Sequence, residues 1–373
     1  MAPIRILQVV TSMRRGGLET MIMNYYRNMD RTQVQFDFLV HRSFTAEYDE
    51  EILSMGGQIY RMPAITAQNI GSYMKQLQRF FAQHSEYKIV HSHIDSLSTL
   101  PLYAAKKAGV PLRIAHSHNT RFDRDKKLPL RLVSRALLPH CANLYWGCGE
   151  QAVRYMFGES VYKKGNYTVL PNAIDLNSFA YNELLRRKKR QELGLSEDTF
   201  AVGHIGRFSW QKNHTRLLDI FAAIHKQNPN SVLLLAGTGT LLGDTLKKAE
   251  LLGLKDFVQY LGVCSDTNAL YQALDVLVLP SHYEGLPVVG IEAQVSGLPC
   301  VFSDVITQEA AIGKPVTYIA LEETDDYWAK AVCSLQNTPR KTHTQAFANA
   351  GYSIEPAAQK LQQWYLTNYR KAE

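Results

Sequence analysis

The stretch "DVLVLPSHYEGLPVVGIEAQVSGLPCVFS", residues 275–303, decides the fold, because it contains a strand, a turn, a helix and a second strand. It begins and ends with short apolar runs, VLVL and CVFS, which are typical of buried strands. The segment PVVGIEAQVS between them predicts a helix, with Pro287 at its first position, where a missing N–H costs nothing. Gly297 and Pro299 are stop signals for that helix. The stretch therefore predicts two parallel strands joined by a crossover helix.

The same alternation continues along almost the whole chain. One helical pattern is LETMIMNYYRNM, in which apolar residues recur at positions 18, 21, 22, 25, 26 and 29. Alternating strands and helices predict parallel sheets that are covered by helices on both faces. We expect strands at residues 6–10, 35–40, 89–92, 113–116, 143–147, 167–170, 200–205, 231–236, 257–260, 276–279, 300–303 and 316–319.

The chain of 373 residues suits two domains better than one core. The strands and helices form two series, each about as long as one doubly wound domain. We therefore expect an α/β protein with two Rossmann-like doubly wound domains that face each other across a cleft. The predicted boundaries are 1–172 for the first domain, 173–355 for the second and 356–373 for a C-terminal helix.

Two segments near these boundaries need an interpretation of their own. The basic run RRKKR at residues 186–190 is expected to be a solvated helix face. The C-terminal segment has a stripe of apolar residues at positions 358, 361, 364 and 365. Such a helix either completes the second domain or packs back on the first.

Composition indicates a folded, soluble protein of a reducing compartment. Apolar residues make up 46% of the chain and charged residues 20%, and no apolar run approaches the roughly 18 residues that span a bilayer. The start, MAPIRILQVV, is too short and too strand-like for a signal peptide. The five cysteines are an odd number and match no common zinc spacing. We therefore expect a cytoplasmic protein.

The charge of the chain is unevenly distributed. Residues 1–170 hold 22 Lys and Arg against 13 Asp and Glu, whereas residues 171–373 hold 19 against 21. A basic first half suggests that this domain faces an anionic partner such as a membrane surface or a nucleic acid. No helix-turn-helix, zinc-finger or ribonucleoprotein pattern accompanies the charge, so we expect no nucleic-acid partner.

Glu284 and Glu292 stand on either side of the start of the helix in the opening stretch. Ligands of open α/β sheets bind at the carboxyl ends of the strands, and a helix N-terminus is a seat for phosphate. Carboxylates beside that seat are suited to accept hydrogen bonds from hydroxyls, those of a hexose at Glu284 and those of a ribose at Glu292. The alternative is a plain favourable interaction of an acid with the helix dipole.

A second turn of the same domain, GHIGRFSWQKNH, carries two cations. Arg207 and Lys212 lie five positions apart, after a strand and before a helix. Two cations at the carboxyl edge of a sheet can neutralise a diphosphate, and they do so more strongly as a leaving group gains charge. The alternative is a pair of solvated surface cations.

The first domain offers a Gly-Gly turn and four histidines. Gly16 and Gly17 allow backbone to approach a ligand closely, although a plain tight turn explains them equally well, and no G-x-G-x-x-G dinucleotide motif is present. The stretches IVHSHID and RIAHSHNT put His91, His93, His116 and His118 at strand ends, but no carboxylate or cysteine completes a metal site. We predict no metal. His118 is the candidate to contact a sugar, and His116 is expected to face the sheet.

A basic amphipathic segment, TRFDRDKKLPLRLVSRALLP, follows these histidines at residues 120–139. Lys and Arg alternate in it with leucines and a valine. A helix of this kind can lie on anionic lipid. Core packing with snorkelling cations explains the same pattern.

These motifs together resemble the retaining glycosyltransferases of family 4, which have the GT-B fold. EGLPVVGIEA fits the E-x7-E motif of that family and GRFSWQKN fits its Arg/Lys turn, while GGLE, HSHNT and LPNAID occur in the expected order. The resemblance covers nearly the whole chain and is strongest to bacterial exopolysaccharide and capsule transferases. Many relatives have Gly-Phe-Gly after the first Glu, where this chain has Gly-Leu-Pro with the E-x7-E spacing preserved.

The resemblance implies a role for each site residue. Glu284 would bind the hydroxyls of the donor hexose, Glu292 the ribose, and Arg207 and Lys212 the departing nucleoside diphosphate. His118 would contact the hexose near its reacting carbon. The backbone of Gly262 and Val263 would hold the base. The backbone of the remaining donor-binding residues would contact the phosphates, and these residues are Gly16, Gly17, Gly285, Leu286 and Val288.

The resemblance also implies the reaction and the partners. The donor would be a nucleotide sugar, most simply a UDP-hexose, and the acceptor a polyprenyl-diphosphate-linked glycan at the inner face of the plasma membrane. No cofactor and no divalent ion would be required, and the sequence DRD at 123–125 is discounted as a metal motif. The C-terminal helix would cross back to the first domain. Two alternatives share the architecture, a sugar-nucleotide 2-epimerase and a non-catalytic nucleotide-sugar-binding subunit of a transferase complex.

Overall fold

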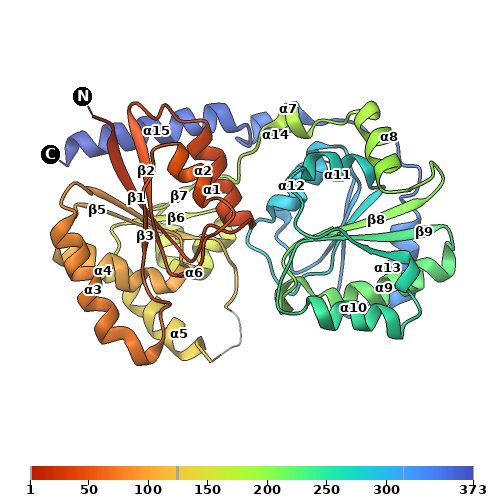
Figure 1. Cartoon of the computed structure of the whole chain (residues 1–373), viewed down its shortest axis with the longest axis horizontal. Helices are drawn as coiled ribbons and strands as arrows, with labels where there is room; N and C mark the ends of the chain where they lie inside the picture. Colours follow the sequence, from red (N-terminus) through yellow and green to blue (C-terminus); the bar gives the residue numbers. More distant parts are fainter. Residues whose placement is uncertain (1, 123–125, 314, 373) are drawn as a thin grey trace. The chain divides into compact units, whose positions relative to one another are not determined.

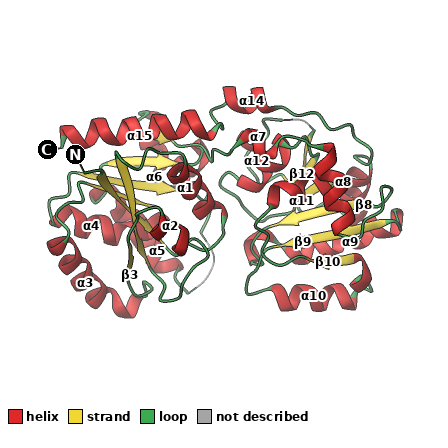
Figure 2. Ribbon diagram, turned by 45° about the horizontal axis from the view of Figure 1, so that its top comes forward, coloured by secondary structure: helices red, strands yellow, loops and turns green. Residues whose placement is uncertain are grey.

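The computed structural model describes residues 2–122, 126–313 and 315–372, and the chain forms two compact units (Figure 1). Unit 1 contains Met1–Ala173 and Ile354–Glu373, and unit 2 contains Ile174–Ser353. Each unit has one parallel sheet with helices on both faces (Figure 2). The predicted α/β class with two Rossmann-like domains is therefore confirmed.

The sheet of unit 1 has seven strands in the order β3-β2-β1-β4-β5-β6-β7, and every pair is parallel. The order reverses at β1, which puts the topological switch point between β1 and β4. The strands are β1 (Ile4–Val10), β2 (Val34–Val40), β3 (Ile59–Arg61), β4 (Ile89–Ser92), β5 (Leu112–Ser117), β6 (Leu144–Gly147) and β7 (Thr168–Val169).

Two apolar clusters cover the two faces of this sheet. Ile6 and Val10 of β1 lie in one cluster, and Leu7 and Val9 lie in the other, as the alternation of side chains along a strand requires. The helices of unit 1 are α1 (Gly17–Arg27), α2 (Asp49–Ser54), α3 (Ile70–Gln83), α4 (Thr99–Lys107), α5 (Leu128–Leu137), α6 (Glu150–Lys163) and α15 (Ile354–Lys371), with short 3₁₀ turns at η1 (Ala67–Asn69), η2 (Asp95–Ser98) and η3 (Leu138–His140).

The C-terminal helix α15 belongs to unit 1, as the resemblance implied. Its buried residues Ala358, Leu361 and Tyr365 lie in the same apolar cluster as residues of α1, β1 and β2. The side-chain oxygen of Gln362 accepts a hydrogen bond of 2.7 Å from the backbone N–H of Asp30. The last segment of the chain therefore completes the first domain rather than the second.

The sheet of unit 2 has six parallel strands in the order β10-β9-β8-β11-β12-β13. The strands are β8 (Phe200–Ile205), β9 (Ser231–Ala236), β10 (Val258–Tyr260), β11 (Val276–Leu279), β12 (Cys300–Ser303) and β13 (Val316–Ile319). The helices are α7 (Leu176–Phe179), α8 (Glu183–Glu192), α9 (His214–Gln227), α10 (Leu242–Leu251), α11 (Thr267–Ala273), α12 (Val288–Val295), α13 (Asp325–Cys333) and α14 (Thr344–Asn349), with 3₁₀ turns at η4 (Trp210–Lys212), η5 (Lys255–Phe257) and η6 (Gln308–Ala310).

Two local predictions for unit 2 were wrong. Pro287 is the N-cap of α12 rather than its first helical residue, with an extended backbone at φ −69° and ψ 111°. The basic run is not a uniformly solvated face, because Arg190 is buried and Arg186 pairs with Asp275 at 2.6 Å. Both arginines also donate to the carbonyl oxygen of Ala273, the last residue of α11. These cations anchor α8 to the rest of unit 2.

Two further findings concern the described residues only. None of their helices has the length and apolar character needed to cross a bilayer. All five cysteines are free thiols, and Cys141, Cys148 and Cys300 are buried.

Candidate functional site

The first component of the site in unit 2 is the turn after β8. All residues of β8 are buried, and the turn that follows contains Arg207 and, in η4, Lys212. Asn213 has a left-handed backbone (φ 55°), and its side chain accepts from the N–H of Arg216, so it caps α9. Gly206 lets the Lys212 side chain pass close to the backbone, because a Cβ at Gly206 would lie 3.2 Å from Lys212 Cε.

The second component is the turn after β11, which carries Glu284. This carboxylate is buried, and its Oε1 accepts hydrogen bonds from Lys212 Nζ at 2.6 Å and from Ser281 Oγ at 2.7 Å. Gln211 Nε2 lies 3.4 Å from the other oxygen. Because β8 and β11 are parallel neighbours, the turns after them meet at one edge of the sheet. The structure thus brings together two residues that are 72 positions apart in sequence.

Backbone hydrogen bonds hold these turns in register. The N–H of His282 donates to the carbonyl of Gln211 at 2.8 Å, which joins the β11 turn to η4. The N–H of Phe208 donates to the carbonyl of Thr238 at 3.0 Å, which joins the β8 turn to the turn after β9. A side chain at Gly237 is excluded there, because its φ is +131° and a Cβ would lie 2.1 Å from the carbonyl oxygen of Gly206.

Arg207 lies at the same edge with its side chain exposed. Within residues 2–122, 126–313 and 315–372, no partner of its guanidinium is found. The two predicted cations therefore differ, since Lys212 is already paired with a buried carboxylate and Arg207 is available to an anion from solvent.

The helix α12 provides an N-terminus and the second glutamate. Gly285, Leu286 and Val288, which precede or begin α12, are buried, and the first N–H groups of a helix have no acceptor within it. Glu292 is buried inside α12, and its Oε2 accepts from the hydroxyl of Tyr271 at 2.7 Å. Burial raises the pKa of Glu292 to about 7, and the bond from Tyr271 only partly opposes this rise.

Gly262 and Val263 lie in the turn after β10, at the same edge but separated from β8 by β9. Gly262 has a left-handed backbone (φ 70°), and its carbonyl accepts from the N–H of Gly237 at 2.7 Å. The side chain of Val263 is exposed. Both residues therefore offer backbone groups at this edge rather than polar or charged side chains.

The predicted residues of unit 1 lie at the carboxyl edge of its own sheet. Gly16 is the N-cap of α1 with an extended backbone, and Gly17 is the first residue of that helix. His118 follows β5 and is partly exposed. The backbone N–H of His118 donates to the carboxylate of Asp95. Asp95 has a left-handed backbone (φ 48°), which is uncommon for a non-glycine residue.

The other three histidines of the two strand-end motifs, His91, His93 and His116, are buried, and His116 was expected to face the sheet. Ring nitrogens of His91, His93 and His116 lie within 4.8 Å of one another, near enough for a shared metal ion. However, hydrogen bonds join His91 to His116 and His93 to His118, each at 3.0 Å. The absence of a metal from the reaction stays a prediction. Residues 123–125, the DRD sequence, lie outside the described residues.

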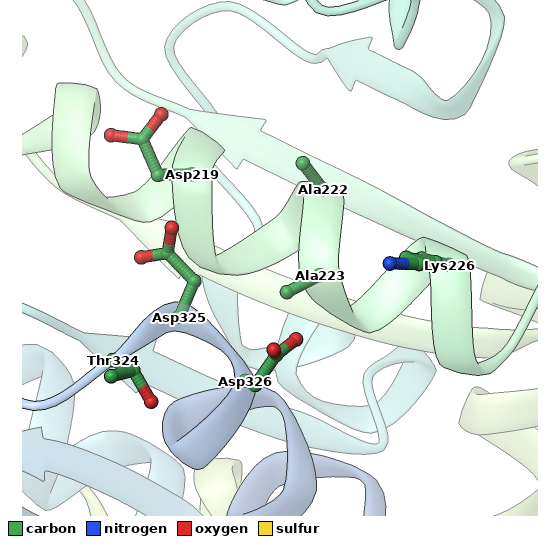
Figure 3. Close-up of a pocket in the computed structure, with 7 residues that line it drawn as sticks. All are labelled: Asp219, Ala222, Ala223, Lys226, Thr324, Asp325 and Asp326. Carbon is green, nitrogen blue, oxygen red and sulfur yellow. The ribbon is translucent and has the colours of Figure 1, made fainter.

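Unit 2 also has a shallow hollow of about 390 Å³ between α9 and α13 (Figure 3). Three aspartates line it with a lysine, and Asp219 and Asp325 pair with Lys248 and Arg216. None of the predicted site residues lines it: the lining residues are Asp219, Ala222, Ala223, Lys226, Thr324, Asp325 and Asp326. We assign it no part in the site.

Sequence reasoning missed the polar side chains that orient the two glutamates. Ser281 stands three positions before Glu284, so its short spacing within the same turn was a usable signal. Tyr271 is a fully buried residue of α11, and nothing in its local sequence distinguishes it from a core tyrosine.

This arrangement suits a ligand that has both anionic and hydroxyl groups. A free cation, a paired cation and a helix N-terminus can hold phosphate, and buried carboxylates with oriented oxygens can accept from hydroxyls. Nucleotide sugars contain both kinds of group.

Comparison with known proteins agrees with this chemistry. Residues 186–353 match the family described as glycosyl transferases group 1, and residues 16–173 match the glycosyl transferase 4-like domain. The chain is 38% identical over 359 residues to EpsF of Bacillus subtilis (strain 168), a protein named as a glycosyltransferase, and this match covers 94% of the chain and 93% of EpsF.

Two further matches have a substrate or a bound ligand in their names. The UDP-Gal:alpha-D-GlcNAc-diphosphoundecaprenol alpha-1,3-galactosyltransferase of Escherichia coli is 30% identical over 226 residues, which cover 59% of this chain and 58% of that enzyme. The crystal structure of Anabaena HepE in complex with UDP and glucose has a TM-score of 0.78 at 18% identity, covering 96% of this chain and 98% of HepE, and so shares the fold.

The two family matches and the near full-length similarity to EpsF confirm the resemblance that the motifs indicated. The chain belongs to the group 1, family 4-like glycosyltransferases with the GT-B fold.

Proposed function

We propose that the protein is a retaining, metal-independent hexosyltransferase. It transfers a hexose from a nucleotide donor, a UDP-sugar, to a polyprenyl-diphosphate-linked or growing glycan in exopolysaccharide or capsule biosynthesis. The observation that carries this proposal is the pair formed by Lys212 and Glu284 at 2.6 Å, beside Arg207 and the N-terminus of α12.

In this proposal the charges of the donor meet opposite charges of the protein. Arg207 and Lys212 bind the diphosphate, and the N–H groups from Gly285 to Val288 complete its seat. Lys212 already holds Glu284 in place, so the lysine links the diphosphate site to the hexose site. Ser281 donates to the same carboxylate oxygen and Gln211 Nε2 lies 3.4 Å from the other, so a hexose hydroxyl would join these partners at Glu284.

Glu292 binds the ribose of the donor in this proposal. Tyr271 occupies one carboxylate oxygen, and the other can accept from a ribose hydroxyl. Backbone at Gly262 and Val263 holds the base. From unit 1, backbone at Gly16 and Gly17 approaches the phosphates, and His118 contacts the hexose.

The proposed reaction is front-face transfer with retention. The bond from the anomeric carbon to the diphosphate oxygen breaks, and an oxocarbenium-like sugar forms. The acceptor hydroxyl adds to the same face of that carbon, and its proton passes to the leaving diphosphate. Arg207 and Lys212 stabilise the charge that grows on the diphosphate, which is the transition-state contribution expected of preorganised cations.

The names of two relatives support the choice of substrates. The Escherichia coli relative is named for a UDP-galactose donor and a diphosphoundecaprenol-linked acceptor, and HepE was crystallised with UDP and glucose. We therefore choose a UDP-hexose as the donor and a polyprenyl-diphosphate-linked glycan as the acceptor.

A lipid-linked acceptor requires the protein to work at a membrane surface, and α5 of unit 1 fits that requirement. Leu132, Val133 and Leu137 expose 51%, 60% and 50% of their surface, which is unusual for apolar side chains on a single helix. Arg131 and Arg135 lie on the same helix, within the basic half of the chain. We propose that this face binds the anionic inner leaflet of the plasma membrane from the cytoplasmic side.

The purified chain tests the proposed function directly. A thermal-shift screen with nucleotide sugars selects the donor, since a ligand that binds only the native state raises its stability. That donor is then incubated with a polyprenyl-diphosphate-linked saccharide, and mass spectrometry and NMR identify the product and its anomeric configuration. We expect a glycosylated acceptor with the configuration of the donor retained.

Other outcomes contradict the proposal in distinguishable ways. A new nucleotide sugar formed from the donor alone would identify a 2-epimerase. Donor binding without transfer to a range of lipid-linked acceptors would favour a non-catalytic subunit. Loss of all turnover on treatment with a chelator, with recovery on adding a divalent ion, would contradict metal independence.

A further inference from the structure

Six polar side chains of unit 1 form a polar chain that ends at His118, and hydrogen bonds make four of its five links. His118 Nε2 lies 3.0 Å from His93 Nδ1, and His93 Nε2 lies 2.8 Å from Gln8 Oε1. The Gln8 side chain also lies close to the hydroxyl of Tyr365. The Tyr365 hydroxyl lies 2.7 Å from His91 Nδ1. His91 Nε2 in turn lies 3.0 Å from His116 Nδ1.

The members of this chain come from distant parts of the sequence. Gln8 lies on β1, His93 and His118 follow β4 and β5, and Tyr365 lies on α15. They meet because β1, β4 and β5 are neighbours in the sheet and α15 packs against the same sheet. This polar chain therefore joins the C-terminal helix α15 to the carboxyl edge of the sheet, where His118 lies.

The four imidazoles of the chain are neutral at physiological pH. Burial lowers the pKa of His118 to about 3, and it lowers the pKa of His91, His93 and His116 well below the ordinary value. A neutral imidazole has one N–H donor and one acceptor nitrogen. Each histidine between two partners must therefore donate to one and accept from the other.

This requirement makes the direction of every link depend on the others. The amide oxygen of Gln8 faces His93, so His93 donates from Nε2 and has only Nδ1 left as an acceptor. His118 must then donate from Nε2 to His93, and its own Nδ1 carries the lone pair. Because Tyr365 donates to His91, its oxygen can only accept from the nearby Gln8 side chain, and this favours the orientation in which the Gln8 oxygen faces His93.

The two ends of this polar chain, His116 and His118, differ in exposure. His116 Nε2 is buried and has no hydrogen-bond partner in the described part of the protein. His118 is partly exposed, and its Nδ1 also has no partner among the residues of the three described ranges. The lone pair of His118 is thus the one acceptor of the chain that an external hydroxyl can reach.

We propose that Gln8 and Tyr365 are positioning residues that hold His118 as the Nε2–H tautomer, with Nδ1 as an acceptor for a hydroxyl of the donor sugar. This inference rests on the proposed function only for the identity of that hydroxyl. The tautomer itself follows from the contacts within unit 1. A sugar hydroxyl would donate to His118 and would remain free to accept elsewhere.

The tautomer is measurable without any activity assay. Protonated and unprotonated ring nitrogens have well-separated ¹⁵N chemical shifts, and long-range ¹H–¹⁵N spectra of the histidine-labelled full-length chain resolve them. His118 is assigned by comparison with His118→Asn. We expect an Nε2–H, unprotonated Nδ1 pattern for His118 in the wild-type protein. An Nδ1–H pattern would overturn the proposal, whatever the activity of the enzyme.

Tyr365→Phe removes only the hydroxyl that orients Gln8. We expect a mixture of His118 tautomers in this variant and a fall of about tenfold or more in kcat/KM for the nucleotide sugar, as the loss of one well-placed hydrogen bond implies. Affinity for UDP, which has no hexose, should stay unchanged. Gln8→Met, which keeps the length of the side chain but cannot hydrogen-bond, should behave in the same way.

The matched control is Tyr73→Phe. Tyr73 is also a buried tyrosine of unit 1 whose hydroxyl lies 2.7 Å from a histidine, His41, but it is outside the chain. Tyr73→Phe should change neither the His118 spectrum nor the kinetics. Equal effects of Tyr73→Phe and Tyr365→Phe would reduce the role of Tyr365 to general stability and overturn the proposal.

Two further outcomes separate this inference from competing explanations. Stoichiometric binding of Zn²⁺ to the purified protein, with shifts of the His91, His93 and His116 nitrogens, would identify a metal site and contradict a hydrogen-bonded chain. If the wild-type tautomer is as expected but no sugar is transferred to any acceptor, the proposed function fails while the tautomer assignment stands.

Discussion

The two units of this protein have the same kind of sheet but opposite chemistry at its carboxyl edge. In unit 2 the edge carries charges, with Lys212 paired to Glu284 and Arg207 exposed beside them. In unit 1 the edge carries neutral imidazoles that are joined to one another and end at His118. Burial without a charged partner explains the neutral state of the histidines, whereas Lys212 stabilises the buried carboxylate of Glu284.

This difference suggests that the two edges suit different groups of a substrate. Charge on the protein is useful where the substrate develops charge, which is the diphosphate. Uncharged groups with a fixed tautomer are useful where the substrate offers neutral hydroxyls, which is the sugar. The following four predictions test this comparison, from the largest expected effect to the smallest.

Removal of either cation of unit 2 should have the largest effect. We expect Arg207→Ala and Lys212→Ala to lower kcat by about 10²–10³-fold, because preorganised positive charge on the leaving group is lost. Steady-state kinetics with the nucleotide sugar measure this effect, and circular dichroism checks the fold. Lys226→Ala, an exposed lysine of α9, is the control and should keep full activity. Near-wild-type turnover in both site variants would refute the proposed role of the charges.

Glu292 should make the stability of the protein depend on pH. Its folded-state pKa is about 7, against an ordinary value of 4.5. Between these values the unfolded chain loses the proton that the folded protein keeps, so the free energy of unfolding falls as pH rises and is constant above about pH 7. The fall amounts to at most about 3 kcal/mol.

Glu292→Gln removes this titration. The variant should therefore gain stability relative to the wild type at pH 8 and gain less at pH 5, as measured by urea unfolding at both values. Glu322→Gln, at an exposed position of the same unit, is the control. A difference between variant and wild type that does not change with pH would show that Glu292 ionises normally in the folded state.

The exposed face of α5 should bind anionic vesicles. Replacing Leu132, Val133 and Leu137 together by serine should weaken binding to vesicles that contain phosphatidylglycerol by roughly tenfold to a hundredfold, because three partly exposed apolar side chains no longer enter the lipid. Flotation assays measure the bound fraction. Leu184→Ser with Leu251→Ser, two leucines of unit 2 that are each 77% exposed, is the matched control. Equal binding by both variants would exclude α5 as the membrane face.

The smallest expected effect is in unit 1, where the His118 ring should not titrate between pH 8 and pH 5. Since burial lowers the pKa of His118 to about 3, its ring signals should not shift between pH 8 and pH 5 in NMR spectra of the folded protein. In urea the same histidines should titrate near 6.5. A midpoint above pH 5 for His118 in the folded protein would mean that unit 1 also carries charge at its edge.

The strands were the easiest features to predict. β8, β9, β11, β12 and β13 occur at the predicted residues, because each is a short, largely apolar run whose pattern is set locally. β3 was missed, since it has only three residues, Ile59–Arg61, at the edge of the sheet and none of them is buried. An edge strand of this kind depends on its neighbour β2 rather than on its own sequence.

The candidate site was predictable in part. The spacing of Glu284 and Glu292 and the turn with Arg207 and Lys212 could be seen in the sequence because they follow strand ends. That Lys212 bonds to Glu284 could not, since it depends on β8 and β11 being neighbours although they are far apart in sequence. The basic run was misjudged for the same reason, because the buried Arg190 contacts the end of α11, 83 positions away in sequence.

By itself the sequence determined the alternation of strands and helices, the presence of two α/β domains and the types of residue at their strand ends. These features depend on periodicity and turn chemistry within about 30 residues. Only the tertiary structure decided which strand ends meet, and therefore that Lys212 contacts Glu284 and that Gln8 and Tyr365 contact the histidines. The order of strands in a sheet is a long-range property, and the contacts that depend on it arise only when the chain has folded.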